Sequence, residues 1–165
     1  MNFSKYIKEK QQSLKSIIGN YNIEIGVVDA SKTQQDVKDG INNAQLLYIQ
    51  EHGSPLNVDE NNQRIPKRPV LQMTINYARK SIIKDMIKDC RKGIFEENWN
   101  SEKVEKRISI ACNSMEKYAR ELIYNNDGRL KRNAESTIKA KGFNHPLFVT
   151  GNLAKSITCR YVKKD

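Results

Sequence analysis

The chain has 165 residues, a formal net charge of +10 and an apolar fraction of 38%. This length fits one domain, and we expect residues 1–165 to fold as one unit. No stretch reaches the roughly 18 uninterrupted apolar residues that a membrane span needs, so we expect no membrane association. The first residues also lack the apolar core of a signal peptide. The three cysteines have neither the even number nor the spacing of a disulfide framework or a zinc ribbon.

The positive charge is concentrated toward the C-terminus. Residues 128–165 carry nine Lys and Arg against two Asp and Glu, whereas residues 1–65 carry seven against eight. Such an asymmetry favours an acidic partner, either nucleic acid or the acidic face of another protein. A solvated surface of lysines that keeps the protein in solution explains the same composition. The charge alone therefore leaves all three interpretations open.

The first part of the chain predicts a helix followed by a strand. Apolar residues recur at near-helical spacing over residues 3–18, which indicates an amphipathic helix. Over residues 21–28 apolar and polar residues alternate, which is typical of a strand with one buried face. Residues 29–40 are polar and rich in turn formers.

A second short helix is predicted over residues 43–51. Ala44, Leu47 and Tyr48 are expected to lie together on one side of it. Gly53 is a natural stop, because glycine adopts left-handed dihedrals without a steric penalty. The predicted helix therefore ends at the His-Gly pair of positions 52 and 53.

An exposed, protruding loop is predicted next, around residues 54–68. Residues 54–64 are polar and contain turn formers. Pro66 and Pro69 then force an extended stretch, because the residue before a proline disfavours helical dihedrals. Pro69 can also open a helix, since its missing N–H would have no partner in the first turn.

Two long helices are predicted in the middle of the chain. Apolar residues recur every three or four positions over residues 71–90, and Gly93 is expected to close this helix. A second run over residues 104–122 starts from Ser101 as its N-cap and ends at the turn formers of residues 125–128. A short polar link joins the two helices, so they should pack as an antiparallel hairpin.

The end of the chain predicts one more strand. Residues 128–149 show no regular period, whereas residues 157–162 alternate and are rich in β-formers. We expect this last strand to pair with residues 21–28 in one sheet. The predicted fold class is therefore α+β, a small antiparallel sheet packed with a long two-helix hairpin and short N-terminal helices.

The sequence carries no recognisable catalytic or metal-binding motif. The histidines, His52 and His145, are far apart, and no G-x-S-x-G, H-E-x-x-H or P-loop pattern occurs. The glutamates of residues 96–105 fit a solvated helix start as well as the carboxylate cluster of a metal-dependent nuclease. We expect no enzyme activity, no catalytic residue, no metal and no cofactor, with a metal nuclease as an alternative.

Basic side chains are frequent over residues 79–92 and in the tail, where phosphate contacts are physically feasible. The aromatic and basic interleaving of RRM or OB folds is absent, and no recognition helix stands out. The residues expected to contact DNA or an acidic partner are Lys155, Arg160, Lys163 and Lys164.

The most distinctive stretch is residues 133–161. It contains T-I-x-x-K-G at 137–142 and P-L-x-V-T-G-x-L-x-x-S-I at 146–157, and I-P-x-R-P-x-L lies upstream at 65–71. These patterns resemble the C-terminal signature of phage virion morphogenesis proteins, the neck and tail-completion family. The resemblance covers most of residues 41–162. One position departs from it, because the acidic residue that usually precedes the Thr-Gly pair is Val149 here.

The resemblance implies a structural subunit of a phage virion that forms a ring at the head-to-tail junction, as a neck or tail-completion protein, and allows DNA passage. It implies self-association into a hexamer or dodecamer and contact with connector, neck and tail proteins. Nonspecific contact with the passing DNA is also expected. Such a subunit would lie in the neck or upper tail of the virion, after assembly in the host cytoplasm. A small basic nucleic-acid-binding protein is the alternative.

The motif positions are the expected subunit or partner interface. They are Ile65, Pro66, Arg68, Pro69, Leu71, Pro146, Leu147, Thr150, Gly151, Leu153, Ser156 and Ile157. We expect Thr150 to act as the N-cap of a short helix that runs through Leu153 into the last strand.

Overall fold

The computed structural model describes residues 3–28, 41–58 and 64–164. The chain divides into two compact units. Unit 1 comprises Met1–Glu24, Asn76–Met115 and Cys159–Asp165, and unit 2 comprises Ile25–Ile75 and Glu116–Thr158. Each unit has its own core and is described by itself.

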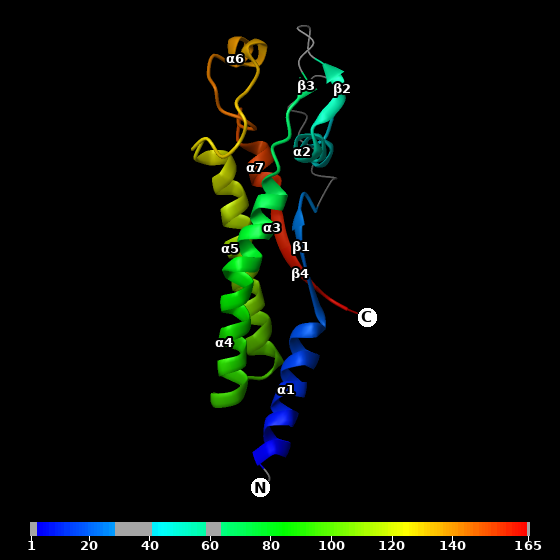
Figure 1. The fold of residues 1–165 in the computed structure, drawn as a ribbon, viewed down its shortest axis with the longest axis vertical. Helices are drawn as coiled ribbons and strands as arrows, with labels where there is room; N and C mark the ends of the chain where they lie inside the picture. The colour runs from blue at the N-terminus through cyan, green and yellow to red at the C-terminus, as the bar shows by residue number, and fades with distance from the viewer. Residues whose placement is uncertain (1–2, 29–40, 59–63, 165) are drawn as a thin grey trace. The chain divides into compact units, whose positions relative to one another are not determined.

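The fold is α+β, as the sequence predicts (Figure 1). The helices are α1 (Phe3–Gly19), α2 (Asn43–His52), α3 (Val70–Lys80), α4 (Ile82–Glu96), α5 (Ser101–Tyr124), α6 (Glu135–Lys141) and α7 (Asn152–Ser156). The strands are β1 (Tyr21–Gly26), β2 (Ser54–Val58), β3 (Arg64–Ile65) and β4 (Thr158–Lys163). β1 pairs with β4, and β2 pairs with β3. The predicted pairing of the first and last long strands is confirmed.

Unit 1 is built on the antiparallel packing of α4 against the first part of α5. Its buried residues are Met86, Cys90, Ile94, Val104, Ile108, Ala111 and Cys112. The ion pair between Arg107 and Asp89, with the Nε and Oδ2 atoms 2.8 Å apart, links the two helices at their surface. The phenol of Tyr21 donates a hydrogen bond to the Glu105 carboxylate, and this bond, together with desolvation, raises the pKa of Tyr21 to about 12.

The first long helix is broken and continues past its predicted stop. α3 ends at Lys80, and Ser81 has φ −124° and ψ −76°, outside the helical region. α4 then runs to Glu96, so the prediction that Gly93 closes the helix is wrong. A Cβ atom at Gly93 would lie 2.1 Å from the ring of Trp99. Glycine is required there because the indole packs against the helix backbone, and the position needs no turn.

The second long helix begins as predicted at Ser101 but has a different cap. The side chain of Asn100 accepts a hydrogen bond of 3.1 Å from the backbone N–H of Lys103. The carbonyl of Asn100 also accepts from the backbone N–H of Val104 at 3.3 Å. Asn100 is therefore the N-cap, and Ser101 is the first helical residue.

Part of the predicted loop around residues 54–68 is a hairpin. β2 and β3 pair antiparallel, with Ser54 opposite Ile65 and Val58 opposite Arg64, and the register shifts between these pairs. Residues 59–63, like residues 29–40, lie outside the described part of the chain. The region from 128 to 149, for which the sequence shows no period, contains α6, which ends at Gly142 with φ 80°.

Unit 2 gathers its core from α2, α3, α5 and α7. Its buried residues are Leu47, Val70, Ala119, Leu122, Ile123, Leu130, Leu153, Ala154 and Ile157. Leu153 and Ile157 belong to the motif of residues 146–157, and Val70 lies in the segment 65–71. These two parts of the resemblance therefore share one core with Leu47 of α2, whereas the third part, residues 137–142, falls on α6 and its C-cap, and α6 buries none of its residues.

The close packing at Gly93 predicts a selective loss of stability. The change Gly93→Ala forces the Trp99 ring away from α4, and such overpacking costs about 1–3 kcal/mol. The matched change Gly19→Ala, at the end of α1, meets nothing within 4 Å and should be neutral or slightly stabilising. Urea unfolding followed by the fluorescence of Trp99, the single tryptophan, measures both. Equal midpoints for the two variants would contradict this account.

Candidate subunit interface

A buried arginine ties the motif segment 65–71 to two other parts of unit 2. Arg68, which is 5% exposed, lies in the segment 65–71, called the arm here. Its Nε donates to the carbonyl of Lys131 at 2.8 Å, and one terminal nitrogen donates to the side-chain oxygen of Gln50 at 2.6 Å. The other donates to the carbonyl of Arg132 at 3.0 Å and to Oδ1 of Asn133 at 3.3 Å. The arm is thereby tied to α2 and to the segment that leads into α6.

These four acceptors of Arg68 are all neutral oxygens. Burial lowers the pKa of the Arg68 guanidinium from its usual value, but an arginine side chain stays charged in proteins. Buried charges need well-placed partners, and here backbone carbonyls and amide oxygens supply them. Removing the guanidinium would leave two backbone carbonyls without this donor. In the single chain Arg68 therefore positions the surface around it, and its contact with a neighbouring subunit stays a prediction.

The end of α2 fixes the start of α3. The carboxylate of Glu51 accepts hydrogen bonds from the backbone N–H groups of Leu71 at 2.9 Å and Gln72 at 2.7 Å. The backbone N–H of Arg68 donates to the carbonyl of Gln50 at 2.7 Å. A negative charge at a helix N-terminus also interacts favourably with the helix dipole. The arm therefore has a fixed path from the β2–β3 hairpin into α3.

Ring contacts and one hydrogen bond hold residues 142–151, the motif loop, in place. Nε2 of His145 lies 2.6 Å from the carbonyl oxygen of Ile123, and its ring stacks on Phe148 with centroids 4.5 Å apart. Phe148 in turn meets Tyr124 edge to face at 5.9 Å. Gly151 has φ 82°, and a Cβ atom there would lie 3.3 Å from the Phe148 ring. The loop is therefore anchored to the end of α5.

Leu147 in this loop has φ +60°. A residue with a side chain rarely adopts this left-handed conformation, which costs on the order of 1–3 kcal/mol and persists only where the surroundings impose it. The half-buried Leu147 side chain packs against the core of unit 2. Strain of this kind clusters at functional sites. The motif loop therefore keeps one conformation at an energetic cost.

The strained loop presents an apolar tip. Val149 is 64% exposed, and Thr150 beside it is exposed as well. The N-cap of α7 is Gly151, so the prediction of Thr150 in that role is wrong by one position. The hydroxyl of Thr150 accepts from the backbone N–H of Asn152 at 3.3 Å and so still supports the start of α7.

The predicted interface residues divide by burial. Exposed or half-buried positions are Ile65, Pro66, Pro69, Leu71, Leu147, Thr150 and Ser156. Buried positions are Arg68, Pro146, Gly151, Leu153 and Ile157. In this conformation the buried group holds the arm, the motif loop and α7 in place, and the exposed group is available to a neighbouring molecule.

The outer face of α2 is a feature that the sequence analysis missed. Ala44, Leu47 and Tyr48 do not lie together, because Leu47 is buried while Tyr48 is 66% exposed. The outer face lines a shallow, open hollow of about 390 Å³, formed by Ile41, Ala44, Gln45, Tyr48 and Ile49. The sequence does contain a signal for this surface, because α2 has apolar residues on both of its sides. A helix of this kind is normally buried on both sides, so an exposed apolar side indicates that a partner covers it.

Two of the four basic tail residues are engaged within unit 1. Nε of Arg160 lies 2.9 Å from a carboxylate oxygen of Glu24, and Nζ of Lys164 donates to the carbonyl of Gly19 at 2.8 Å. Lys155 and Lys163 are exposed. All four side chains are nevertheless exposed, so the predicted contact of the tail with DNA or an acidic partner stays a prediction.

The described part of the chain shows no cluster of three His, Cys, Asp or Glu side chains placed to hold a metal ion. His52 instead contacts its own helix: its Nδ1 lies 3.0 Å from the carbonyl oxygen of Tyr48, and its ring packs on the Tyr48 ring with centroids 4.4 Å apart.

Among the described helices, none has the length and apolar character to cross a membrane.

Comparison of the chain with models of protein families, with curated proteins and with solved structures gives no match. The arguments about function therefore rest on the residues and contacts of this chain.

The hydrogen bonds of Arg68 predict a large effect of its removal. The change Arg68→Ala leaves buried oxygens unpaired, at about 1–3 kcal/mol for each group, so we expect a loss of about 3 kcal/mol or more in the free energy of unfolding. Arg68→Lys should recover only part of it, because one ammonium cannot reach all four acceptors. Urea unfolding followed by circular dichroism measures both, with Lys67→Ala as the exposed control. An Arg68→Ala variant as stable as Lys67→Ala would contradict this role.

Proposed function

We propose that this chain is a structural subunit of a phage virion that assembles into a ring at the head-to-tail junction, as a neck or tail-completion protein. The observation that carries the proposal is the motif loop, which is strained at Leu147, anchored by ring contacts and exposes Val149 at its tip. A loop fixed in this way loses little conformational entropy when a neighbour packs on it. Its features suit an assembly contact.

A ring requires two different faces on each subunit, because head-to-tail contacts pair unlike surfaces. The motif loop supplies an apolar projection, and the outer face of α2 supplies an apolar hollow in the same unit. Both are exposed in the isolated chain. We propose that Val149 of one subunit packs into the hollow at Tyr48 and Ile49 of the next.

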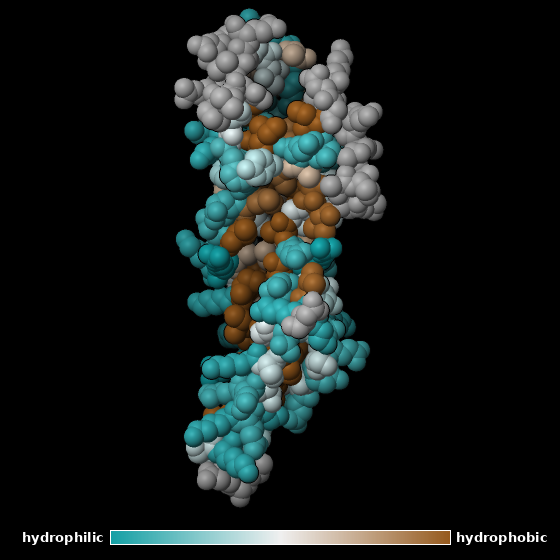
Figure 2. All heavy atoms as spheres, turned by 90° about the vertical axis from the view of Figure 1, so that its right-hand side faces the viewer, coloured by the Kyte–Doolittle hydropathy of each residue, from teal (hydrophilic) through white to brown (hydrophobic). Residues whose placement is uncertain are grey.

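The exposure of apolar side chains supports an interface of this kind. Tyr48 and Val149 are the most exposed of the large apolar side chains among the described residues, at 66% and 64%. Figure 2 shows hydrophobic atoms (brown) exposed between hydrophilic ones (teal). Burying a valine side chain contributes about 1.5–3 kcal/mol, and an exposed tyrosine adds apolar area with a polar tip. One such contact is weak, but a subunit in a closed ring makes it twice.

The position in the virion follows from the resemblance stated above. A ring between the connector or neck and the tail contacts both structures and surrounds the DNA that passes through its bore. The arm and α2 are joined by Arg68 and Glu51, so contacts made by either one are held in register with the other. This arrangement supports a structural role and requires no catalytic group.

The apolar tip predicts that one charge blocks assembly. Val149→Asp places a carboxylate in the apolar contact and should weaken association by about 2–3 kcal/mol, which is roughly 30- to 150-fold. The matched control is Val162→Asp, which changes a valine of β4 that is 38% exposed. Light scattering at several concentrations gives the mass of each protein. We expect ring-sized species for the wild type and for Val162→Asp, and smaller species for Val149→Asp.

Two results would count against the proposal. One is an equal mass for Val149→Asp and the wild type at every concentration. The other is a strictly monomeric wild type that joins no phage neck or tail structure but binds DNA tightly, which would favour a small basic nucleic-acid-binding protein instead.

A further inference from the structure

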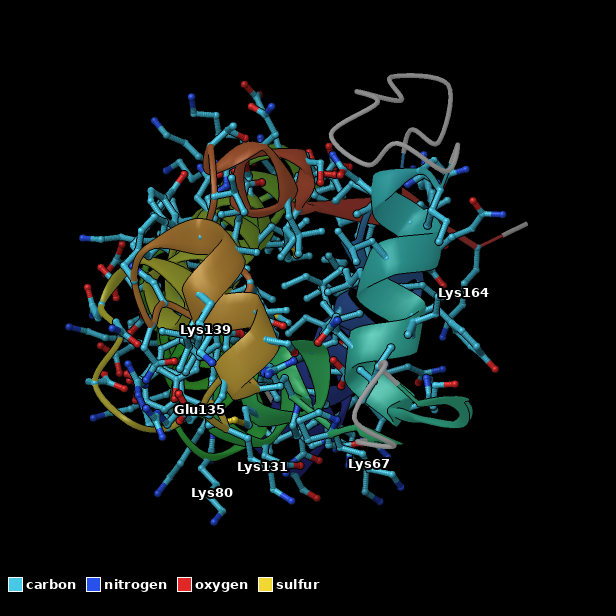
Figure 3. The ribbon with its side chains drawn as sticks, turned by 90° about the horizontal axis from the view of Figure 1, so that it is seen from above. Lys67, Lys80, Lys131, Glu135, Lys139 and Lys164 are labelled. Carbon is cyan, nitrogen blue, oxygen red and sulfur yellow. The ribbon has the colours of Figure 1, made fainter. Side chains whose placement is uncertain are left out.

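Basic side chains from two distant segments meet in unit 2. The hydrogen bonds of Arg68 to the carbonyls of Lys131 and Arg132 bring the arm, with Lys67, next to the segment that leads into α6. We call Lys67, Lys131 and Lys139 the basic surface; Figure 3 labels all three, with Lys67 and Lys131 at the same edge of the view and Lys139 on α6. The two segments are more than 60 positions apart, so no continuous run of basic residues in the sequence indicates this surface.

The positive charge of this surface is poorly compensated within the described residues. Lys67, Lys131 and Lys139 are exposed, and no described side chain pairs with their amino groups. The acidic residue of this segment, Glu135, is engaged with Arg132, at 2.7 Å.

Below the basic surface lie two further cations with neutral partners. Arg68 donates only to neutral oxygens, and Nζ of Lys141 donates to the carbonyl of His145 at 3.0 Å. Burial lowers the pKa of Lys141, and the nearby charge of Arg68 lowers it further. Arg68 is buried and Lys141 is half-buried, so both charges are less screened than fully exposed ones and add to the positive potential at the surface.

One more buried donor lies beside Arg68. Asn133 is 8% exposed, and its Nδ2 has no hydrogen-bond partner among the described residues. The amide orientation is fixed, since Oδ1 faces the guanidinium of Arg68 and must accept from it. This donor is buried, so it cannot reach a ligand outside the protein, and binding at the surface would have to use the exposed side chains.

We propose that the basic surface binds the phosphate backbone of duplex DNA through Lys67, Lys131 and Lys139, without reading the base sequence. Lysine is depleted from protein interfaces, where aromatic residues and arginine prevail, whereas phosphate contacts commonly use lysine. Arg132 is also exposed beside Lys131 but is paired with Glu135, so the exposed cations of these segments without a carboxylate partner among the described side chains are the three lysines. This chemistry suits a phosphate backbone better than an acidic protein face.

The test is the salt dependence of DNA binding by the full chain. Each phosphate contact contributes about 0.9 to the slope of log K against log salt concentration. The triple variant Lys67→Gln, Lys131→Gln, Lys139→Gln should therefore lower the magnitude of the slope by about 2 to 3 and weaken binding at low salt by roughly tenfold or more. Fluorescence anisotropy with two labelled duplexes of unrelated sequence measures it. Both duplexes should bind equally.

The matched control carries the same change of net charge in unit 1. Lys8, Lys15 and Lys106 are exposed there, and their triple change to glutamine should alter the slope by less than 1. Equal effects of the two triple variants would overturn the proposal, since binding would then follow net charge alone. Absence of DNA binding by the wild type would overturn it too, as would tighter binding to poly-glutamate than to DNA at equal salt or a preference for one duplex.

The proposal is independent of ring formation. Val149→Asp leaves all three lysines in place and should keep the salt slope per chain, whatever its mass in solution. Loss of DNA binding in the lysine variant with an unchanged mass would support the basic surface. A circular dichroism spectrum equal to that of the wild type shows that the variant is folded.

Discussion

The buried guanidinium of Arg68 is the interaction on which unit 2 depends. It links three segments that are distant in sequence: the arm, the end of α2 and the segment 131–133. Its four acceptors are all neutral oxygens, so the buried charge is stabilised only where the path of the chain places these oxygens around it. A residue with this many directional bonds fixes geometry as well as energy. The arm cannot move without breaking contacts in all three segments.

The surface features follow from this constraint. With the arm and α2 fixed, Leu47, Val70 and Leu153 share one core, and α7 is held against α2. The motif loop leads into α7, and its strained residue Leu147 packs against the same core. The apolar tip, the α2 hollow and the basic surface are thus three exposed consequences of one buried framework. Subunit association and DNA contact can be altered separately, because they use different side chains of that framework.

The sequence predicted the elements whose residues alternate between buried and exposed. α1, β1, α5 and β4 have strong periods and were found close to their bounds. α6 was missed because it buries none of its residues and so leaves no apolar period. The motif order located the loop, but an arginine between two prolines gave no sign of its burial, since that depends on carbonyls more than 60 positions away. Likewise the sequence predicts that Gly93 ends a helix, because no sequence pattern shows that the Trp99 ring packs against the backbone at this position.

Disulfide trapping between subunits tests most directly the claim that the motif loop and α2 of neighbouring subunits meet. The double variant Tyr48→Cys, Val149→Cys is made in a Cys159→Ser background, because the other two native cysteines are buried. Mild oxidation should give a ladder of covalent oligomers up to the ring, while either single variant gives at most dimers. Only monomers and dimers from the double variant, under conditions where the protein is oligomeric, would contradict the account.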